Sequence, residues 1–195
     1  KGRQSMADVD ARIAAGTLSF RNVHYFPAGA TIYGGDANVA YEYAGKSYMG
    51  KWDHNGGGRG AECTYCHLDD HTFEPQWNQS NCGGCHGEAT SLDTIRKDRD
   101  VDYNGVNGTN DSLHDEVATF GEAVYTEMKA WAIAQGLDHI VYDSGSYPYW
   151  FLDANDDGMA DLDMDGEKIR YGDWDDALLK ASFNYQFYKK EPGAW

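Results

Sequence analysis

The sequence predicts a loop-rich fold, mainly helical with a few short strands, whose interior is built around bound groups more than around aliphatic side chains. Glycine accounts for 23 of the 195 residues and tyrosine for 14, and few segments show sustained aliphatic periodicity. All four cysteines stand in one stretch, ECTYCHLDDHTFEPQWNQSNCGGCHGE, over residues 62–88. On composition alone, a Gly-rich β protein remains the alternative.

The charge of the chain excludes some classes of partner. Sixteen Lys and Arg stand against 32 Asp and Glu, so the formal charge is −16. Such a chain repels phosphate backbones and anionic lipid surfaces, and we expect no nucleic-acid partner. No apolar run approaches the roughly 20 residues that cross a bilayer, and the N-terminus lacks the apolar core of a signal peptide. We expect one mature, soluble domain over residues 1–195.

The expected elements follow in chain order. Residues 1–50 should form short strands, because 18–48 alternates aromatic or β-branched residues with small ones and includes a hairpin turning near 44–46. Residues 51–110 show almost no periodicity, so we expect loops that a cofactor orders.

Two helices follow. Residues 111–136 predict a helix with Asp111 or Ser112 at its start and Gly136 at its end. One apolar face is expected on it, made of Val117, Phe120, Val124, Met128 and Trp131. Residues 173–191 predict a second helix that stops before Pro192.

The cysteines form the pattern C-x2-C-x15-C-x2-C, and a histidine follows each pair. The spacing also suits a zinc ribbon, in which four thiolates hold a structural metal. A zinc ribbon has no need of His67 and His86, however, and neither a catalytic dithiol nor a pair of disulfides explains them. The C-x-x-C-H pattern therefore favours covalent attachment of two c-type haems.

The chemistry of this motif is geometric. Two thiols three residues apart can form thioethers with the two vinyl groups of one porphyrin, and the adjoining histidine reaches the iron. We expect two such sets to hold two haems, namely Cys63, Cys66, His67 and Cys82, Cys85, His86. The two macrocycles would then form the core of a region that has few aliphatic residues, with Tyr and Trp packing against them.

Each iron needs a sixth ligand, and histidine on both faces is the economical choice. His71 lies too close to His67 to cross to the far face of the same haem, so we expect it to serve the neighbouring one. His24, in a strand-like aromatic setting, is slightly preferred to His54, which lies in a flexible loop. We expect His114 and His139 to be structural.

The stretch RNVHYFPAGATIYGGDANVAYEYAGKSY, the two C-x-x-C-H motifs, the DDHTFEP between them, and the later YPYWFLDANDDG and LLKASFNYQFYKKEPGAW resemble the multihaem c-type cytochromes of metal-reducing bacteria. This family is found in the periplasm and on the outer cell surface. The resemblance runs over most of the chain and implies a multihaem cytochrome c-like fold. The haem motifs are its specific part.

The chain departs from the family at both ends. In the family a further C-x-x-C-H commonly precedes a stretch like Gly2-Arg3, and the terminal helix is followed by more sequence. The resemblance thus implies a processed piece or one unit of a longer haem chain. Three distal candidates, His24, His54 and His71, then face two attachment motifs, so one of them could ligate an iron of another chain.

The segment 150–170 is an acidic loop. Asp153, Asn155 and Asp157, then Gly158 and Asp161, match the opening of an EF-hand-type calcium loop, but Met164 stands where a bidentate Glu belongs. A second run follows, so we expect one or two calcium ions that rigidify the fold, with these ligands: Asp153, Asn155, Asp157, Met159, Asp161, Asp163 and Asp165. The alternative is a solvated acidic surface loop.

The function expected from the sequence is electron transfer by a dihaem cytochrome, not catalysis. Its partners would be other c-type cytochromes, copies of itself in a filament, or an external acceptor such as a metal oxide. Covalent haem attachment takes place outside the cytoplasm, so we expect a periplasmic, cell-surface or extracellular location. The alternatives are a peroxidase-like dihaem enzyme with one open iron, and a zinc-ribbon binding module.

Overall fold

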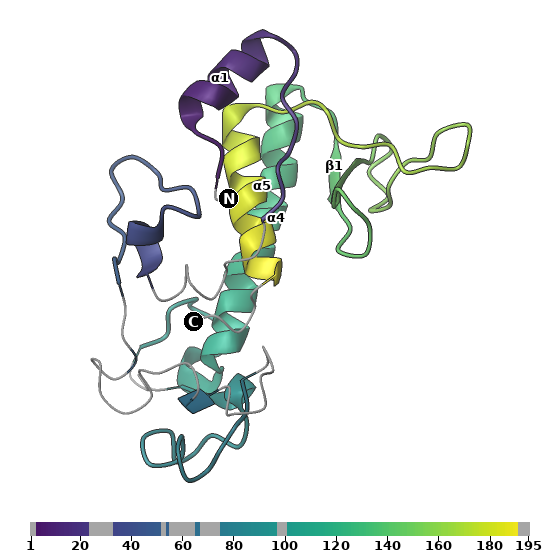
Figure 1. Ribbon diagram of the computed structural model, residues 1–195. Coiled ribbons are helices and arrows are strands. Elements are labelled where there is room, and N and C mark those ends of the chain that lie inside the picture. Colours follow the sequence, from purple (N-terminus) through teal and green to yellow (C-terminus); the bar gives the residue numbers. More distant parts are fainter. Residues whose placement is uncertain are drawn as a thin grey trace. The chain divides into compact units, whose positions relative to one another are not determined.

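The computed structural model describes residues 3–23, 33–51, 54, 65–66, 75–96 and 101–190. In this part of the chain it has three longer helices, short 3-10 turns and one two-stranded sheet (Figure 1). The elements are α1 (Met6–Ala14), η1 (Gly34–Ala37), η3 (Leu92–Thr94), η4 (Gly108–Asn110), α4 (Leu113–Gln135), β1 (Ile140–Tyr142), β2 (Trp150–Leu152) and α5 (Asp176–Lys190). None of the helices described here combines the length and the apolar character needed to span a membrane.

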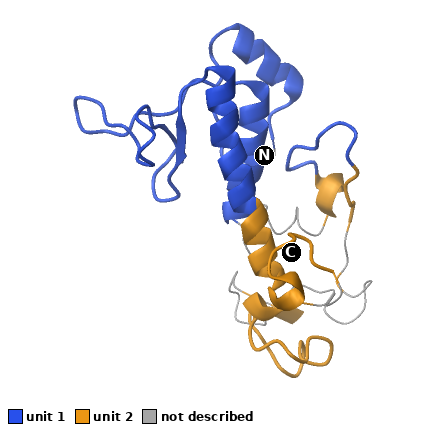
Figure 2. Cartoon of the chain, turned by 180° about the vertical axis from the view of Figure 1, so that it is seen from behind, with its two compact units in different colours: residues 1–27, 38–46, 121–190 blue, residues 28–37, 47–120, 191–195 orange. Residues whose placement is uncertain are grey.

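The chain forms two compact units, which Figure 2 colours separately. Unit 1 comprises residues 1–27, 38–46 and 121–190, and unit 2 comprises residues 28–37, 47–120 and 191–195. Where the sequence predicts one domain, α4 contributes its first residues to unit 2 and the rest to unit 1. The cysteine-motif residues that the structure describes all belong to unit 2.

Unit 1 is built on α5 and the C-terminal part of α4, which lie side by side and antiparallel (Figure 1). The Trp131 indole donates to the Asp175 carboxylate at 2.8 Å near one end of the pair. Near the other end Gly121 lies so close to Tyr188 that a Cβ would come within 2.2 Å of its ring. The buried core of this unit is largely aromatic: Val9, Val23, Tyr41, Met128, Ala132, Ile140, Trp150, Tyr171, Trp174, Leu178, Leu179, Phe183 and Tyr185.

The helix expected at 111–136 is found at Leu113–Gln135. Ser112 caps it, since its hydroxyl accepts the Asp115 N–H at 3.1 Å while the Asp115 carboxylate accepts the Ser112 N–H at 3.3 Å. Gly136 ends it with a φ of 71°, and the Leu137 N–H returns to the Ala132 carbonyl at 2.9 Å. These are the capping residues that the sequence indicates.

The prediction of which residues form the buried face of this helix is largely wrong. Met128 is buried, but Phe120, Val124 and Trp131 are 48%, 41% and 43% exposed. The buried face runs instead through Gly121, Met128 and Ala132, because the missing side chain at Gly121 admits the Tyr188 ring of α5.

The strands expected in residues 1–50 are not found among the described residues, and α1 occupies Met6–Ala14 instead. In a strand, the backbone groups of these residues would bond to a neighbouring strand. Here two of them bond instead to side chains of α5. The Val23 N–H donates to Gln186 and the Tyr41 N–H to Asn184, both at 2.8 Å. The expected turn near residues 44–46 is present, closed by the Lys46 N–H on the Tyr43 carbonyl at 3.2 Å.

The helix expected at 173–191 is α5, whose first turn is capped by Asp175 accepting the Leu178 N–H at 2.6 Å. β1 and β2 pair antiparallel, with Ile140 opposite Leu152 and Tyr142 opposite Trp150. The hairpin brings Tyr142 and Trp150 onto the aromatic core, with 4.8 Å between their ring centres.

Candidate functional site

The second cysteine motif folds as one tight turn. The Cys82 N–H donates to the Asn78 carbonyl at 2.7 Å, and the His86 N–H donates to the Cys82 carbonyl at 2.9 Å. The latter bond spans four residues, as in one turn of an α-helix, so Cys82 and His86 point to the same side, with Cys85 beside them. Cys82 is half-buried, Cys85 is exposed, and the structure forms no disulfide between them.

Gly83 is required by the closeness of this turn. A Cβ at position 83 would lie 2.6 Å from the Gln79 carbonyl oxygen and 2.1 Å from the Gln79 side-chain nitrogen. Gly84 has open space around it, with no atom within 4 Å of such a Cβ. Of the two glycines between the cysteines, only Gly83 is therefore fixed by packing.

Two residues that sequence reasoning missed join the two motifs. Tyr65 lies between the cysteines of the first motif, and Asn81 directly precedes the second. The Tyr65 hydroxyl donates to the Asn81 carbonyl at 3.2 Å, and the Asn81 amide donates to the Tyr65 carbonyl at 3.5 Å. Their position within and beside the motifs is the only sequence signal that could have found them. The contact keeps the two motifs adjacent, although 15 residues separate Cys66 from Cys82.

The rings of His54 and His86 lie close together in unit 2. Their ring centres are 6.2 Å apart and their planes are nearly parallel, with an angle of 12° between them. His54 is exposed and His86 is half-buried. The structure thus brings one of the distal candidates of the sequence next to one of the two motif histidines.

The other expected ligands are placed as follows. His24 and His71, and also Cys63 and His67, lie outside the described residues. His114 lies in the first turn of α4 with its Nδ1 3.8 Å from the Asp93 carboxylate, and the His139 Nδ1 is 3.8 Å from that of Asp156. Each thus has an acidic neighbour at 3.8 Å, and the structural role expected for both stays a prediction.

The part of unit 2 that the structure describes forms almost no apolar interior. Among its described residues, the buried hydrophobic set consists of Ala89 alone, which is 7% exposed. The unit is held instead by polar contacts, above all by the buried ion pair between Arg96 and Glu116. Arg96 also donates to the Asp111 carbonyl at 2.7 Å, and Glu116 accepts the Tyr103 N–H at 3.1 Å.

The acidic loop is organised by hydrogen bonds to its own backbone. Asp153, 1% exposed, accepts the N–H groups of Asp157 and Gly158, each at 3.0 Å. Asn155 donates to Asp157 at 3.0 Å, and Asp161 accepts the Ala154 N–H at 2.8 Å.

The remaining expected calcium ligands point outward or bond locally. Met159 is 65% exposed, and Asp163 accepts the N–H groups of Asp165 and Glu167, each at 2.9 Å. Within the described ranges, no three His, Cys, Asp or Glu side chains are gathered closely enough to hold a metal ion. The described loop is thus ordered by local hydrogen bonds and contains no preformed cluster of ligands.

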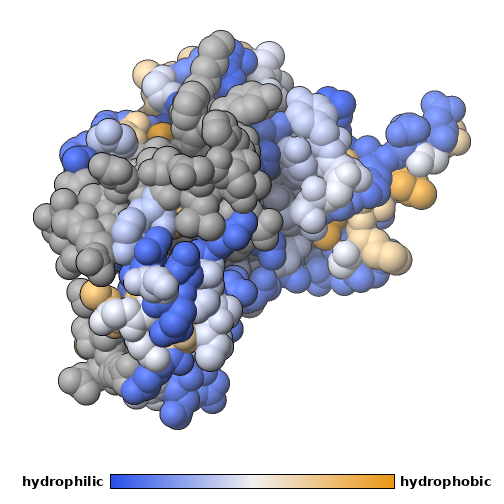
Figure 3. Space-filling model, turned by 60° about the horizontal axis from the view of Figure 1, so that its bottom comes forward, coloured by the Kyte–Doolittle hydropathy of each residue, from blue (hydrophilic) through white to orange (hydrophobic). Residues whose placement is uncertain are grey.

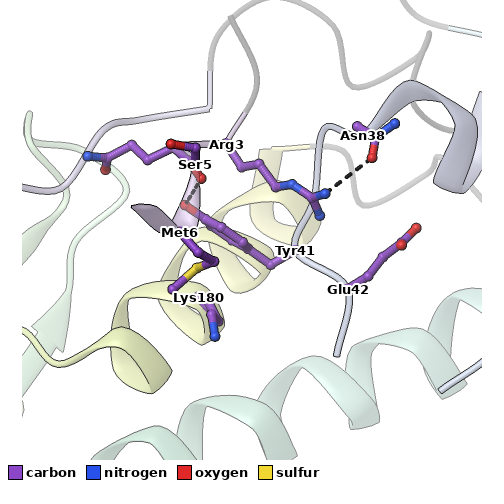
Figure 4. Close-up of a pocket in the computed structure, with 8 residues that line it drawn as sticks. Arg3, Ser5, Met6, Asn38, Tyr41, Glu42 and Lys180 are labelled. Atoms are coloured by element: carbon purple, nitrogen blue, oxygen red, sulfur yellow. Dashed lines mark hydrogen bonds between the residues drawn. The ribbon is translucent and has the colours of Figure 1, made fainter. Parts of the chain in front are cut away.

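A pocket in unit 1, drawn in Figure 4, includes none of the expected site residues. Arg3 donates to Asn38 at 3.2 Å across its rim, and the Tyr41 hydroxyl donates to the Gln4 carbonyl at 2.9 Å. Arg3 and Lys180 stand against Glu42 there, so its charges are mixed. It adds nothing to the chemistry of the cysteine motifs.

No family model, curated protein or solved structure matches this chain. The chemistry of the site must therefore be inferred from its own residues. These are two thiols in one turn, a histidine on the same turn and a second imidazole close to that histidine. That donor set suits a porphyrin bound by two thioethers, with imidazole on its iron.

Proposed function

We propose that this chain is a dihaem c-type cytochrome that transfers single electrons. Cys63, Cys66 and His67 would hold one haem, and Cys82, Cys85 and His86 the other. Histidine on both faces of each iron would leave no open site, so the protein is a carrier and not an enzyme. Bound haem supplies the reversible one-electron change of its iron.

The observation that supports this proposal most is how little apolar surface the described residues of unit 2 bury. The described residues of unit 2 bury one hydrophobic side chain, that of an alanine. They therefore bury little apolar surface to offset the conformational entropy that is lost on folding. Two large apolar macrocycles attached at positions 63–67 and 82–86 would supply this burial. Unit 1, by contrast, has a core of ordinary residues and needs no such group.

The contact between the two motifs would place the two haems close enough for electron transfer between them. Tyr65 of the first motif bonds to Asn81, which precedes the second motif, so macrocycles attached at the two motifs would be neighbours. Electrons can then pass between the two irons without any acid or base. In this proposal the chain's residues attach the two groups and hold them in order.

The partners follow from charge and from the family resemblance. We propose other c-type cytochromes, further copies of this chain, or an external metal oxide as redox partners, at the periplasmic or outer face of the cell. With a formal charge of −16, the chain favours basic patches on a partner. Association with such a patch should weaken as salt is added.

Absorption spectra of cysteine variants test the proposal. The wild-type chain should show Soret and α bands that survive denaturing extraction, corresponding to two haems per chain. The double variant Cys82→Ala/Cys85→Ala should retain one haem. Stoichiometric zinc in place of haem would favour the zinc-ribbon alternative, and carbon monoxide binding to the reduced wild type would favour the dihaem enzyme.

We also propose that the acidic loop binds calcium as a structural ion. Asp153 is buried, and the partners that the structure gives it are two backbone N–H groups, with no cation among the described residues. A buried carboxylate without a cation is costly, which a bound Ca²⁺ would offset. Asp157 and Asp161 lie in the same loop and would be the further ligands, and their side chains would have to move for all three carboxylates to reach one ion.

A further inference from the structure

The paired imidazoles of unit 2 identify one sixth ligand. Two trans imidazoles on one metal have two metal–nitrogen bonds of about 2 Å each, and the half-widths of the two rings bring the distance between ring centres to roughly 6 Å. The ring centres of His54 and His86 are 6.2 Å apart, with planes 12° from parallel. The two rings thus have the separation that a shared iron requires.

A simple stack of two rings is the competing explanation, since offset aromatic rings occur at similar separations. Such a stack is stabilised mainly by the burial of ring area. Here His54 is exposed and His86 only half-buried, so little area is removed from water. His86, moreover, directly follows Cys85 on the turn that would hold a porphyrin.

We infer that His54 and His86 are the two axial ligands of one iron, that of the haem attached to Cys82 and Cys85. The inference rests on the proposed function and assigns the one pairing that the described residues support. The sequence alone gave a slight preference to His24 over His54. A loop histidine thus completes the second haem from a position 28 residues before the first residue of its attachment motif.

The test uses the full, haem-loaded chain and two substitutions of His54. In His54→Ala, one iron should lose its sixth ligand, so the reduced protein should bind one carbon monoxide per chain where the wild type binds none. In His54→Met, one haem should stay six-coordinate with a higher reduction potential, because methionine stabilises ferrous iron. Added imidazole should restore the low-spin electron paramagnetic resonance signal in His54→Ala.

Two further variants give the controls. His114→Ala, in the same unit, should leave both signals unchanged. The double variant Cys63→Ala/Cys66→Ala keeps only the second haem, and His54→Ala in that background should still create a carbon monoxide site. If His54→Ala opens no iron, or opens one only when the first haem is present, the pairing is wrong. A wild-type chain without covalent haem would instead overturn the proposed function itself.

Discussion

At the residue scale, a few side chains decide whether the cysteine turn can form. Gly83 is fixed because the turn presses its backbone against Gln79, whereas Gly84 faces open space. Tyr65 and Asn81 hold one motif against the other through two hydrogen bonds. None of these roles can be read from a C-x-x-C-H pattern, which specifies only the thiols and the imidazole.

Gly83→Ala should distort the turn and weaken haem attachment at the second motif. The added Cβ would meet the Gln79 carbonyl at 2.6 Å, so the backbone must shift, at a cost of about 1–3 kcal/mol in unfolding free energy. Gly84→Ala is the matched control and should be neutral or slightly stabilising. Thermal unfolding and the haem content of the two variants check this, and equal losses in both would contradict it.

Glu116→Ala should destabilise the chain strongly. Its carboxylate, 1% exposed, pairs with Arg96, and removing it leaves a buried guanidinium without its counter-charge; such losses amount to about 3–5 kcal/mol. Arg12→Ala removes only a solvent-exposed ion pair with Asp8 and should change the free energy of unfolding little. Denaturant unfolding of the two variants measures both values, and a similar cost for both would contradict the account.

At the element scale, the helices were the predictable part. The ends of α4 were indicated by Ser112 and Gly136, because capping chemistry is local and visible in sequence. Its buried face was not, because that depends on how Tyr188 of α5 packs over Gly121. In the described part of residues 18–48 the expected strands are not found for a similar reason, since α5 side chains accept the N–H groups of Val23 and Tyr41.

Buried tyrosines in the hairpin, in α5 and in the segment between them predict that the stability of the fold depends on pH. Burial raises the pKa of Tyr142 to about 12, with the neighbouring Tyr149 adding to the effect, and burial also raises the pKa values of Tyr171 and Tyr185. Above the ordinary pKa the unfolded chain loses these phenol protons, while the folded state still holds them. Their contribution is complete below the ordinary tyrosine pKa of 10.0 and falls as the pH rises toward about 12.

Denaturant unfolding at increasing alkaline pH measures this effect. The free energy of unfolding should fall through that window, and Tyr142→Phe, which cannot ionise there, should show a smaller fall. An identical fall in the two proteins would exclude the burial of Tyr142 as a cause.

The acidic loop gives the second prediction at this scale. Calcium at about a hundred times its dissociation constant should stabilise the fold by about 2.7 kcal/mol, and a chelator should remove the gain. Asp153→Asn should abolish it, while Asp176→Asn, outside the loop, should not. No rise in unfolding temperature with calcium in the wild type would leave a solvated acidic loop as the explanation.

At the scale of the whole molecule, the two units differ in what fills them. Unit 1 has an aromatic core that a sequence pattern of scattered Tyr and Trp hardly reveals. Unit 2 has the lack of apolar periodicity that the sequence showed over residues 51–110, and its described residues bury almost no hydrophobic side chain. The face of the molecule in Figure 3 is mainly hydrophilic where it is coloured, in keeping with the formal charge of −16.

The candidate site was predictable from the sequence only in part. The sequence could name the thiols and adjoining histidines as candidates, because the chemistry proposed for them requires a fixed short spacing. The histidine that lies beside His86 could not be named, because a residue brought from a distant part of the chain leaves no local pattern. His54 was one of three candidates, and only its place opposite His86 distinguishes it.

The mass of the intact, denatured protein tests the central claim most directly. If two porphyrins joined by thioether bonds form the interior of unit 2, the purified chain should exceed its polypeptide mass of 21.7 kDa by two haem groups. These should remain bound when the fold is lost. A mass equal to that of the amino acids alone, in protein matured by a cell able to attach c-type haem, would contradict the account.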